Sequence, residues 1–582
     1  MESSKKIILY QIFTRLFGNR NATCKPNGTI EENGCGKMND IDAKVLRQIR
    51  AMGVTHIWLT GIIRHATQTD YSAHGIPQQH AEVVKGRAGS PYAIADYYDV
   101  DPDLATDVDS RMQEFEALVE RIHKAGMKVI IDFVPNHVAR EYHSICKPAG
   151  VKDLGEDDDV NMHFSTSNNF YYCWGQPLNL SYIEHGTLNF ELSDMPTEQE
   201  DSNHKVQCSK FKVQRYEESP AKATGNDVFS AMPSQNDWYE TVKLNYGIDY
   251  CDAGGRSEHF SPIPNTWGKM TDILLFWAAK GIDGFRCDMA EMVPSAFWAW
   301  VTDKVKYRYP EKIFIGEVYD PNQYRNYIGA GFDYLYDKVG MYDCIRDVIC
   351  HRRRAADITA QWQQTDDIRR HMLYFLENHD EQRIASTFFA DDARRGIPGL
   401  LVSALFGQNP FMFYAGQEVG EPGMDAEGFS GCDGRTTIFD YWSVATLRQA
   451  YFDRRRMTKD ERALETVYQK VLRMAAEEPA VSDGQTYDLM YVNPQLADRQ
   501  FAFLRSADNE LLVVVANFDD QPVSTSVQIP RHAFEFLRLP QTEVTATDLL
   551  TGSEHKLLLY ADTPIAINVP ANNGIVLKVA FK

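Results

Sequence analysis

Four short polar segments each follow an apolar run, and each brings a carboxylate to the end of a predicted strand. The segments are residues 132–137 (DFVPNH), 284–288 (GFRCD), 316–318 (GEV) and 377–380 (ENHD). The runs before them, 129–131, 281–285, 313–315 and 372–376, are typical of strands buried in a parallel sheet. Because a (β/α)8 barrel gathers the carboxyl ends of its strands at one face, we expect these side chains to share one pocket.

The other barrel elements follow from alternating strand and helix patterns. The run at 129–131 belongs to a strand predicted at 127–134, and further strands are predicted at 7–13, 54–59, 332–336 and 410–414. Helices are predicted at 42–52, 110–125, 270–280 and 458–477. Such alternation predicts a parallel sheet with right-handed crossovers, and hence the α/β class with a TIM barrel.

Two stretches depart from this alternation. Residues 140–245 are polar, aromatic and irregular, as expected of a subdomain inserted after the third strand. From residue 483 short alternating runs replace the helices, which predicts a C-terminal antiparallel β-sandwich. We therefore predict a catalytic barrel at 1–139 and 246–482, an inserted subdomain at 140–245 and a β-sandwich at 483–582.

Net charge and hydropathy indicate which kinds of molecule this chain can bind and whether it enters a membrane. The formal charge of −21 disfavours nucleic acid and suits a neutral partner such as a sugar, although solubility alone would also explain it. No apolar run approaches the roughly 18–20 residues that span a bilayer, so we expect no membrane segment. The first residues lack a secretory core, so we expect a cytoplasmic protein or one whose leader was removed. Oligomeric state stays open.

The strand-end residues fit glycosidic cleavage. That reaction needs one acid to protonate the leaving oxygen and one carboxylate to attack or shield the anomeric carbon. Asp288 is the candidate nucleophile, and Arg286, on the same strand face, is expected to lower its pKa and keep it ionised. Glu317 is the candidate general acid, a role that requires a raised pKa.

A third carboxylate and two histidines complete the candidate site. Asp380 is expected to bind sugar hydroxyls and stabilise the distorted ring, with hydrogen bonds from His379 and His137. Any one of these carboxylates could instead cap a loop. Their joint position at successive strand ends favours a catalytic site.

The four segments together resemble the conserved regions of the α-amylase family of glycoside hydrolases. The resemblance places Asp288, Glu317 and Asp380 at the nucleophile, acid/base and transition-state-stabilising positions. The residues that match the invariant sugar-pocket positions of the family are Arg286, His137 and His379. The resemblance implies hydrolysis or transfer at α-glucosidic bonds with retention of configuration.

Further matches extend the candidate substrate site. Residues 91–98 resemble the segment with the family's aromatic platform, so Tyr92 is expected to stack under the sugar, although a lone tyrosine could equally be packing. Arg383 completes an Asn-His-Asp-x-x-Arg pattern of oligoglucosidase-like branches and is a substrate-binding candidate, with a surface salt bridge as the alternative. Residues 242–245 resemble a further family motif.

The resemblance also implies a candidate calcium site. The family's common Ca²⁺ site uses the asparagine of the first motif, which is Asn136 here, with other ligands from the inserted subdomain. Typical members also have a Lys-His pair shortly after the nucleophile, whereas this chain continues Met289-Ala290-Glu291-Met292 and has no such pair there. We expect no required cofactor and leave Ca²⁺ open, with hydrogen bonding of Asn136 to a neighbouring loop as the alternative.

The sequence therefore predicts a retaining hydrolase that cuts α-1,4 bonds in starch-derived maltooligosaccharides. Residues 289–292 (MAEM) look closer to cyclomaltodextrinase and neopullulanase members. An α-1,6-cleaving or transglycosylating enzyme is therefore an alternative, since bond choice depends on loops beyond the first sugar. A catalytically inactive carbohydrate-binding homologue is a weaker alternative, because all three acids and the arginine are kept.

Overall fold

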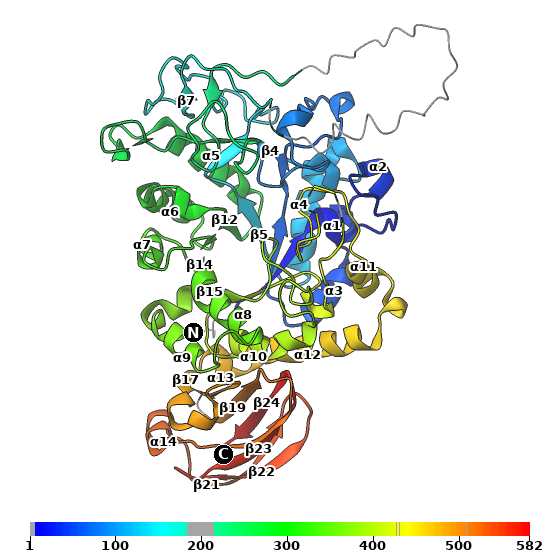
Figure 1. Cartoon of the computed structure of the whole chain (residues 1–582), viewed down its shortest axis with the longest axis vertical. Coiled ribbons are helices and arrows are strands. Elements are labelled where there is room, and N and C mark those ends of the chain that lie inside the picture. Colours follow the sequence, from blue (N-terminus) through cyan, green and yellow to red (C-terminus); the bar gives the residue numbers. More distant parts are fainter. Residues whose placement is uncertain are drawn as a thin grey trace, which may run out of the picture.

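A closed barrel of eight parallel strands forms the centre of the computed structural model, which describes residues 6–181, 183, 215–426, 428, 429, 431–507 and 509–581. The barrel lies between an irregular loop-rich segment at one end and a β-domain at the other (Figure 1). Its strands are β1 (Ile8–Phe13), β2 (His56–Thr60), β5 (Lys128–Phe133), β12 (Gly284–Cys287), β13 (Ile313–Gly316), β14 (Tyr334–Tyr336), β15 (Met372–Phe375) and β16 (Phe411–Tyr414). The predicted (β/α)8 fold is confirmed.

The register between strands sets the geometry of the predicted site. Arg286 on β12 pairs with Asp132 on β5 and with Ile315 on β13. Because neighbours in register share a face of the sheet, Asp132 and Arg286 point to the same side. Asp288 and Glu317 follow one residue after β12 and β13 end, so both lie at the carboxyl end of the barrel.

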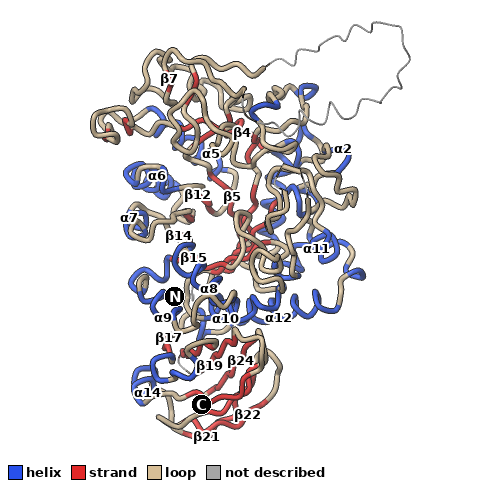
Figure 2. The backbone as a smooth tube through the Cα atoms, viewed as in Figure 1, coloured by secondary structure: helices blue, strands red, loops and turns tan. Residues whose placement is uncertain are grey.

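Helices surround the barrel, as the blue and red segments of Figure 2 show. The longer ones are α3 (Ala43–Ala51), α4 (Arg111–Lys124), α5 (Asn265–Ala279), α6 (Ser295–Arg308), α10 (Ile397–Leu405) and α12 (Lys459–Glu477). Shorter ones are α7 (Tyr324–Gly329), α8 (Asp343–Ile349) and α9 (Asp357–Gln363). Helix α12 begins after Thr458 because the Thr458 and Glu461 side chains form a capping box. Helix α5 starts earlier than predicted because Trp267 already packs in the core.

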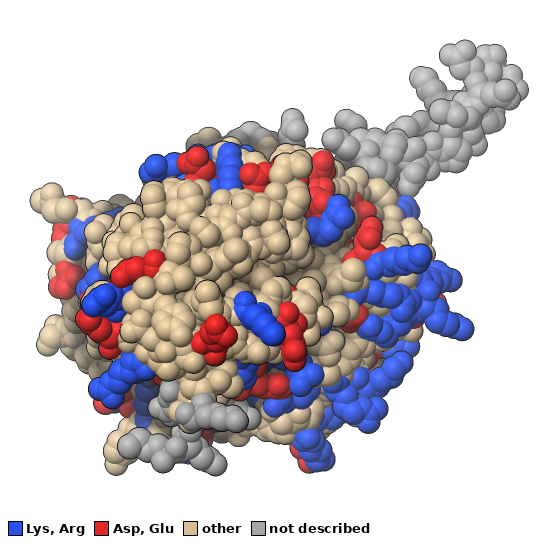
Figure 3. All heavy atoms as spheres, turned by 90° about the horizontal axis from the view of Figure 1, so that it is seen from below, with Lys and Arg blue, Asp and Glu red and all other residues tan. Residues whose placement is uncertain are grey.

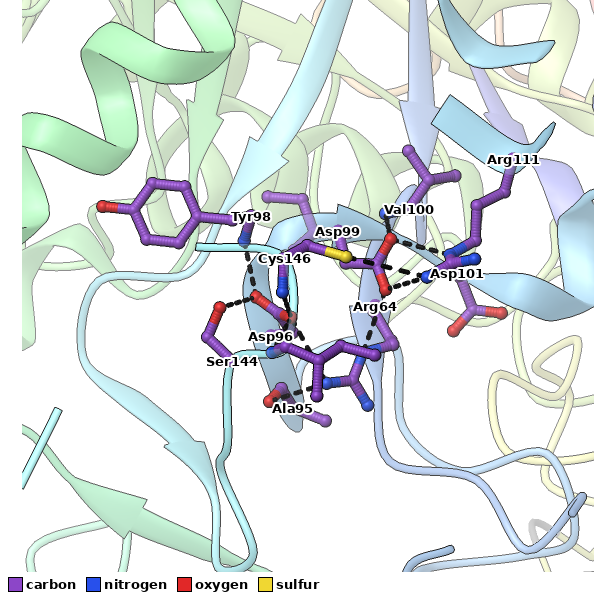
Figure 4. Close-up of polar contacts among 12 residues, drawn as sticks. Arg64, Ala95, Asp96, Tyr98, Asp99, Val100, Asp101, Arg111, Ser144 and Cys146 are labelled. Atoms are coloured by element: carbon purple, nitrogen blue, oxygen red, sulfur yellow. Dashed lines mark hydrogen bonds and ion pairs between the residues drawn. The ribbon is translucent and has the colours of Figure 1, made fainter. Parts of the chain in front are cut away.

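The irregular segment leaves and rejoins the barrel through paired short strands. Strand β6 (His137–Ala139) pairs antiparallel with β9 (Thr241–Lys243), so the two ends of the segment lie side by side. Strand β3 (Ile63–His65) pairs with β4 (Ile94–Val100) next to them. Beneath the segment, Arg64 binds Asp96 and Asp99, and Ser144 donates to Asp96 (Figure 4). This buried network anchors the segment to the barrel.

The C-terminal domain is built on an antiparallel sheet of six strands. The sheet order is β17 (Gln485–Asp488), β18 (Gln500–Ala507), β19 (Glu510–Asn517), β24 (Asn573–Ala580), β21 (Thr542–Asp548) and β22 (Glu554–Leu559). A second sheet pairs β20 (Val523–Val527) with β23 (Ile565–Val569). The sequence did not predict β17, β21 or β22, because polar residues dominate them and few of their side chains are buried.

Buried contacts join this domain to the barrel. Phe406, just after α10, packs against Phe501 and Phe503 of β18, with ring centroids 5.8 and 5.2 Å apart. Asp488 of β17 accepts hydrogen bonds from Thr359 and Trp362 of α9. Within the described residues, no helix has the length and apolar character needed to cross a bilayer.

Candidate active site

A cavity of about 360 Å³ lies where the predicted catalytic side chains meet, at the carboxyl end of the barrel strands. The predicted residues that line it are Tyr92, His137, Asp288, Glu317 and Asp380. Arg286 and His379 lie directly behind this lining, in contact with Asp288 and Asp380. The structure thus brings seven of the nine predicted site residues together and leaves Asn136 and Arg383 outside the lining.

Arg286 bridges the two candidate catalytic carboxylates. Its Nη1 lies 2.8 Å from Asp288 Oδ1, and its Nη2 lies 2.6 Å from Glu317 Oε2. Asp132 Oδ1 lies 3.2 Å from the same Nη1. The guanidinium, 1% exposed, also lies 5.1 Å from the Trp58 ring centroid, so aromatic packing fixes its orientation.

The pKa of Asp288 differs from the sequence expectation. Arg286 was predicted to lower it, and the ion pair does act in that direction. Burial acts more strongly, and with the added repulsion of Glu317 and Asp132 it raises the pKa of Asp288 well above its ordinary value. Burial likewise raises the pKa of Asp132 to about 6. Asp288 and Asp132 therefore hold a proton more readily than free carboxyl groups, which is the opposite of the sequence expectation for Asp288.

Glu317 is held by two further hydrogen bonds. The Met289 backbone N–H donates to Glu317 Oε2 at 2.8 Å, and the Tyr319 hydroxyl donates to Oε1 at 2.6 Å. Met289 has a left-handed backbone with φ of 41°, which is rare for a residue with a side chain. This turn directs its N–H toward the candidate acid, so local backbone strain coincides with the predicted chemistry.

His137 lines the cavity, whereas His379 lies behind the lining and contacts two residues that do line it. His379 Nε2 lies 2.5 Å from the Tyr92 hydroxyl and 3.1 Å from Asp380 Oδ2. Its ring stacks on Tyr92 with centroids 5.2 Å apart, whereas His137 packs against Trp238 at the same centroid distance. Burial lowers the pKa of both His379 and His137 to about 3, so both imidazoles are neutral near pH 7.

Arg383 belongs to a buried structural network and does not line the cavity. Its Nη1 donates to Glu377 at 2.9 Å, its Nε to Thr436 at 2.9 Å and its Nη2 to the Ala415 carbonyl at 3.0 Å. The guanidinium also lies 3.9 Å from the Tyr414 ring centroid. These contacts favour the salt-bridge alternative over substrate binding, except that the bridge is buried.

The surroundings of Asn136 do not fit a calcium ion. Lys243 Nζ lies 2.7 Å from Asn136 Oδ1 and 2.5 Å from Asp227 Oδ1. The amide nitrogen of Asn136 donates to the Gly225 carbonyl at 2.7 Å. Because an ammonium group already occupies the space that a cation would take between these oxygens, the loop-bonding alternative for Asn136 is the better one.

Two other groups of candidate ligands occur in the described part of the chain. Asp96, Asp99 and Cys146 lie close together, but Arg64 and Arg111 already supply positive charge to the carboxylates (Figure 4). The oxygens of Asp249 and Asp252, grouped with His259, accept N–H groups of their own loop. Neither group needs a metal ion to explain its geometry.

Several cavity residues were not predicted. They are Lys85, Ser90, Trp238, Glu240, Thr241, Met289, Tyr319, Ile438 and Phe439. Most lie on long loops, where no periodic pattern marks a side chain as pointing inward. Two signals were nevertheless present: 238–241 directly precede the motif at 242–245, and Ile438 and Phe439 fall in a stretch, 433–440, that looks family-like.

Comparison with known proteins decides the family. A family model described as the alpha amylase catalytic domain matches residues 11–179 and 262–485. The chain belongs to the α-amylase family of glycoside hydrolases. This confirms the resemblance that the four strand-end segments indicated.

Relatives of this α-amylase family member differ in their names. The chain is 23% identical to "Alpha-amylase MalA" of Haloarcula japonica, over 90% of this chain and 56% of that protein. It is 22% identical to "Neopullulanase 2" of Thermoactinomyces vulgaris, over 95% of this chain and 74% of that protein. The chain thus spans little more than half the length of the first of these relatives.

Solved structures share the fold. An α-amylase from Geobacillus thermoleovorans, complexed with acarbose, matches with a TM-score of 0.62 and 18% identity. The match covers 99% of this chain and 98% of that one. The similarity therefore includes the barrel, the irregular segment and the C-terminal β-domain.

Proposed function

We propose that this α-amylase family protein hydrolyses α-1,4-glucosidic bonds of starch-derived maltooligosaccharides with retention of configuration. The observation that carries the proposal is the bridging of Asp288 and Glu317 by the two terminal nitrogens of Arg286. One guanidinium between two carboxylates favours the short separation of retaining enzymes, roughly 5–5.5 Å, over the roughly 6.5–9.5 Å of inverting ones.

The geometry supports a two-step displacement. A glucose unit lies over the Tyr92 ring, and Asp288 attacks its anomeric carbon while Glu317 gives a proton to the leaving glycosidic oxygen. Glu317, now ionised, then removes a proton from water, whose oxygen attacks the same carbon and releases Asp288. Asp380 binds sugar hydroxyls throughout, and the neutral His379 behind it holds the Tyr92 hydroxyl under the sugar.

The substrate class draws support from the cavity and the relatives. The cavity combines aromatic rings with hydroxyl-binding groups, as a sugar pocket requires. Similar proteins are named α-amylase, neopullulanase and cyclomaltodextrinase. Residues 289–292 (MAEM) lack the Lys-His pair of typical α-amylases, and this favours α-1,6 cleavage or transglycosylation as the second candidate.

Proton NMR of maltoheptaose digestion tests the proposal. We expect wild-type protein to release α-anomers first, and we expect Asp288→Asn, checked for folding by circular dichroism, to release none. Initial β-anomers would overturn the retaining mechanism. An inactive wild type would be tested next on pullulan and isomaltose, where turnover would establish the α-1,6 alternative. Longer products after adding maltose would reveal transfer.

A further inference from the structure

A group of aromatic side chains lies on the C-terminal domain, away from the catalytic cavity. It consists of Tyr487 on β17, Tyr491 after it, and His532 and Phe536 on α14 (Arg531–Leu537). The Tyr487 ring centroid lies 6.4, 5.8 and 6.0 Å from those of Tyr491, His532 and Phe536. Strand β17 and helix α14 lie on the same side of this domain (Figure 1). We call these four residues the aromatic cluster.

Hydrogen bonds hold the aromatic cluster in place while two of its rings face solvent. The Tyr487 hydroxyl lies 2.7 Å from that of Tyr491 and 3.0 Å from His532 Nδ1. Tyr491 is 64% exposed and Phe536 is 48% exposed, whereas Tyr487 is 9% exposed. The Tyr491 ring is held by its hydrogen bond and the Phe536 ring by packing against Tyr487 and His532, so ordering them costs little entropy when a ligand stacks on them.

A polar pocket of about 330 Å³ adjoins the cluster at Phe536. Side chains that can bind hydroxyl groups line it, including Arg370, Gln408, Asn409 and Gln485. Asn409 is 1% exposed, and its Oδ1 has no hydrogen-bond partner among the described residues. A buried acceptor without a donor beside a pocket favours a ligand that brings a donor, such as a sugar hydroxyl.

Two of the three arginines that line the pocket already have contacts within the protein. Arg505 uses all its N–H groups on the Thr486 hydroxyl and on backbone carbonyls, and Arg369 packs over the Trp362 ring at 5.4 Å. Arg370, the third arginine of the lining, is exposed and can bind either a hydroxyl group or an anion, so competition by phosphate is part of the test. From the end that carries the C-terminal domain, broad uncharged stretches separate the charged side chains (Figure 3).

The pocket lies at the opposite end of the barrel from the catalytic cavity. Arg370 comes just before β15, and Gln408 and Asn409 come just before β16. These residues are therefore at the amino ends of the strands, whereas Asp380 follows the carboxyl end of β15. A sugar bound here could not reach the catalytic acids, so it would serve as a separate attachment point.

We propose that the aromatic cluster and the adjoining pocket form a second α-glucan-binding site. Ring faces of Tyr491 and Phe536 stack on sugar C–H groups, and amide and guanidinium groups bind the hydroxyls. The choice of α-glucan rests on the proposed function. Binding one polymer at two places raises its effective concentration at the catalytic cavity, which benefits long substrates and not short ones.

Affinity electrophoresis through soluble starch tests this site in the full-length chain. In an Asp288→Asn background, we expect Tyr491→Ala with Phe536→Ala to weaken retardation about tenfold, since two stacking rings are lost. Tyr560→Ala is the matched control, because this tyrosine is 41% exposed on the same domain but outside the cluster. In the active protein the double variant should lower the rate on dilute starch and leave maltotriose hydrolysis unchanged.

Three results would overturn the second site. The first is that starch retards the double variant as much as the unmutated protein. The second is that inorganic phosphate abolishes retardation and maltoheptaose does not. The third is that the double variant changes its oligomeric state and that this change accounts for the lost retardation. Failure of the proposed function is distinguishable, because wild type would then hydrolyse no α-1,4-glucan while starch retardation still depended on Tyr491 and Phe536. Hydrolysis that persists without cluster-dependent retardation would instead overturn only the second site.

Discussion

The Lys243 ammonium lies 2.7 Å from Asn136 Oδ1, between the barrel and the irregular segment. It also lies 2.5 Å from Asp227 Oδ1, so one buried cation links Asn136 to two positions of the irregular segment. Strand pairing of β6 with β9 brings Lys243 into register with His137, the residue after Asn136. The chain thus supplies its own positive charge at this junction.

The first prediction concerns calcium. We expect EDTA to leave both activity and unfolding temperature unchanged, because Lys243 replaces a cation at Asn136. Lys243→Ala should lower the free energy of unfolding by about 3 kcal/mol, since it breaks a buried ion pair. Thermal unfolding with and without EDTA measures both effects.

A complementary variant sharpens the calcium test. Lys243→Asp exchanges the ammonium for a carboxylate beside Asn136 and Asp227, which creates an oxygen-rich site. We expect added Ca²⁺ to raise the unfolding temperature of this variant and not that of wild type. Loss of wild-type activity in EDTA would contradict the assignment.

The second prediction separates the two roles considered for Arg383. Arg383→Ala leaves Glu377 buried without its partner, so we expect a loss of about 3–5 kcal/mol in the free energy of unfolding. The double variant Arg383→Leu with Glu377→Leu should be less destabilised, because no unpaired charge remains. KM at low temperature should stay near the wild-type value. A raised KM with unchanged unfolding temperature would restore the substrate-binding role.

The third prediction concerns Trp238 in the cavity wall. Its ring packs 5.2 Å from His137 and borders the space in which the substrate is expected. Trp238→Ala should raise KM about 2- to 10-fold with a smaller change in kcat, since stacking contributes mainly to binding. Trp174→Ala is the control, because Trp174 is 65% exposed and does not line the cavity. Equal KM values in the two variants would exclude Trp238 from the substrate site.

The fourth prediction is a dependence of stability on pH. Burial, with the nearby charge of Arg286, lowers the pKa of His379 from 6.5 to about 3. Between these values the unfolded chain binds a proton that the folded chain does not, so this residue makes stability fall as pH falls below about 6.5. His379→Gln removes that contribution, and its unfolding temperature should decline less steeply from pH 7 to pH 5. Parallel curves for wild type and variant would show that His379 does not titrate in this way.

Much of the barrel was predictable because its signals are local. The runs before the four carboxylate segments are apolar and short, and helices such as α12 carry their own capping residues. Because Asp288, Glu317 and Asp380 follow the carboxyl ends of barrel strands, they lie at the same face of the barrel for any conformation of the loops. The strands β17, β21 and β22 of the C-terminal sheet were missed, because half-buried strands with polar exposed faces lack a clear hydrophobic pattern.

The sequence by itself determined the fold class, the family and the set of carboxylates, because strand periodicity and motif order are written along the chain. Only the tertiary structure decided what each group faces. It showed that burial outweighs Arg286 in setting the pKa of Asp288, and that Lys243 stands beside Asn136. It also showed that Arg383 donates a hydrogen bond to Glu377. Charge interactions and desolvation depend on distances across the fold, and these arise only when distant segments pack together.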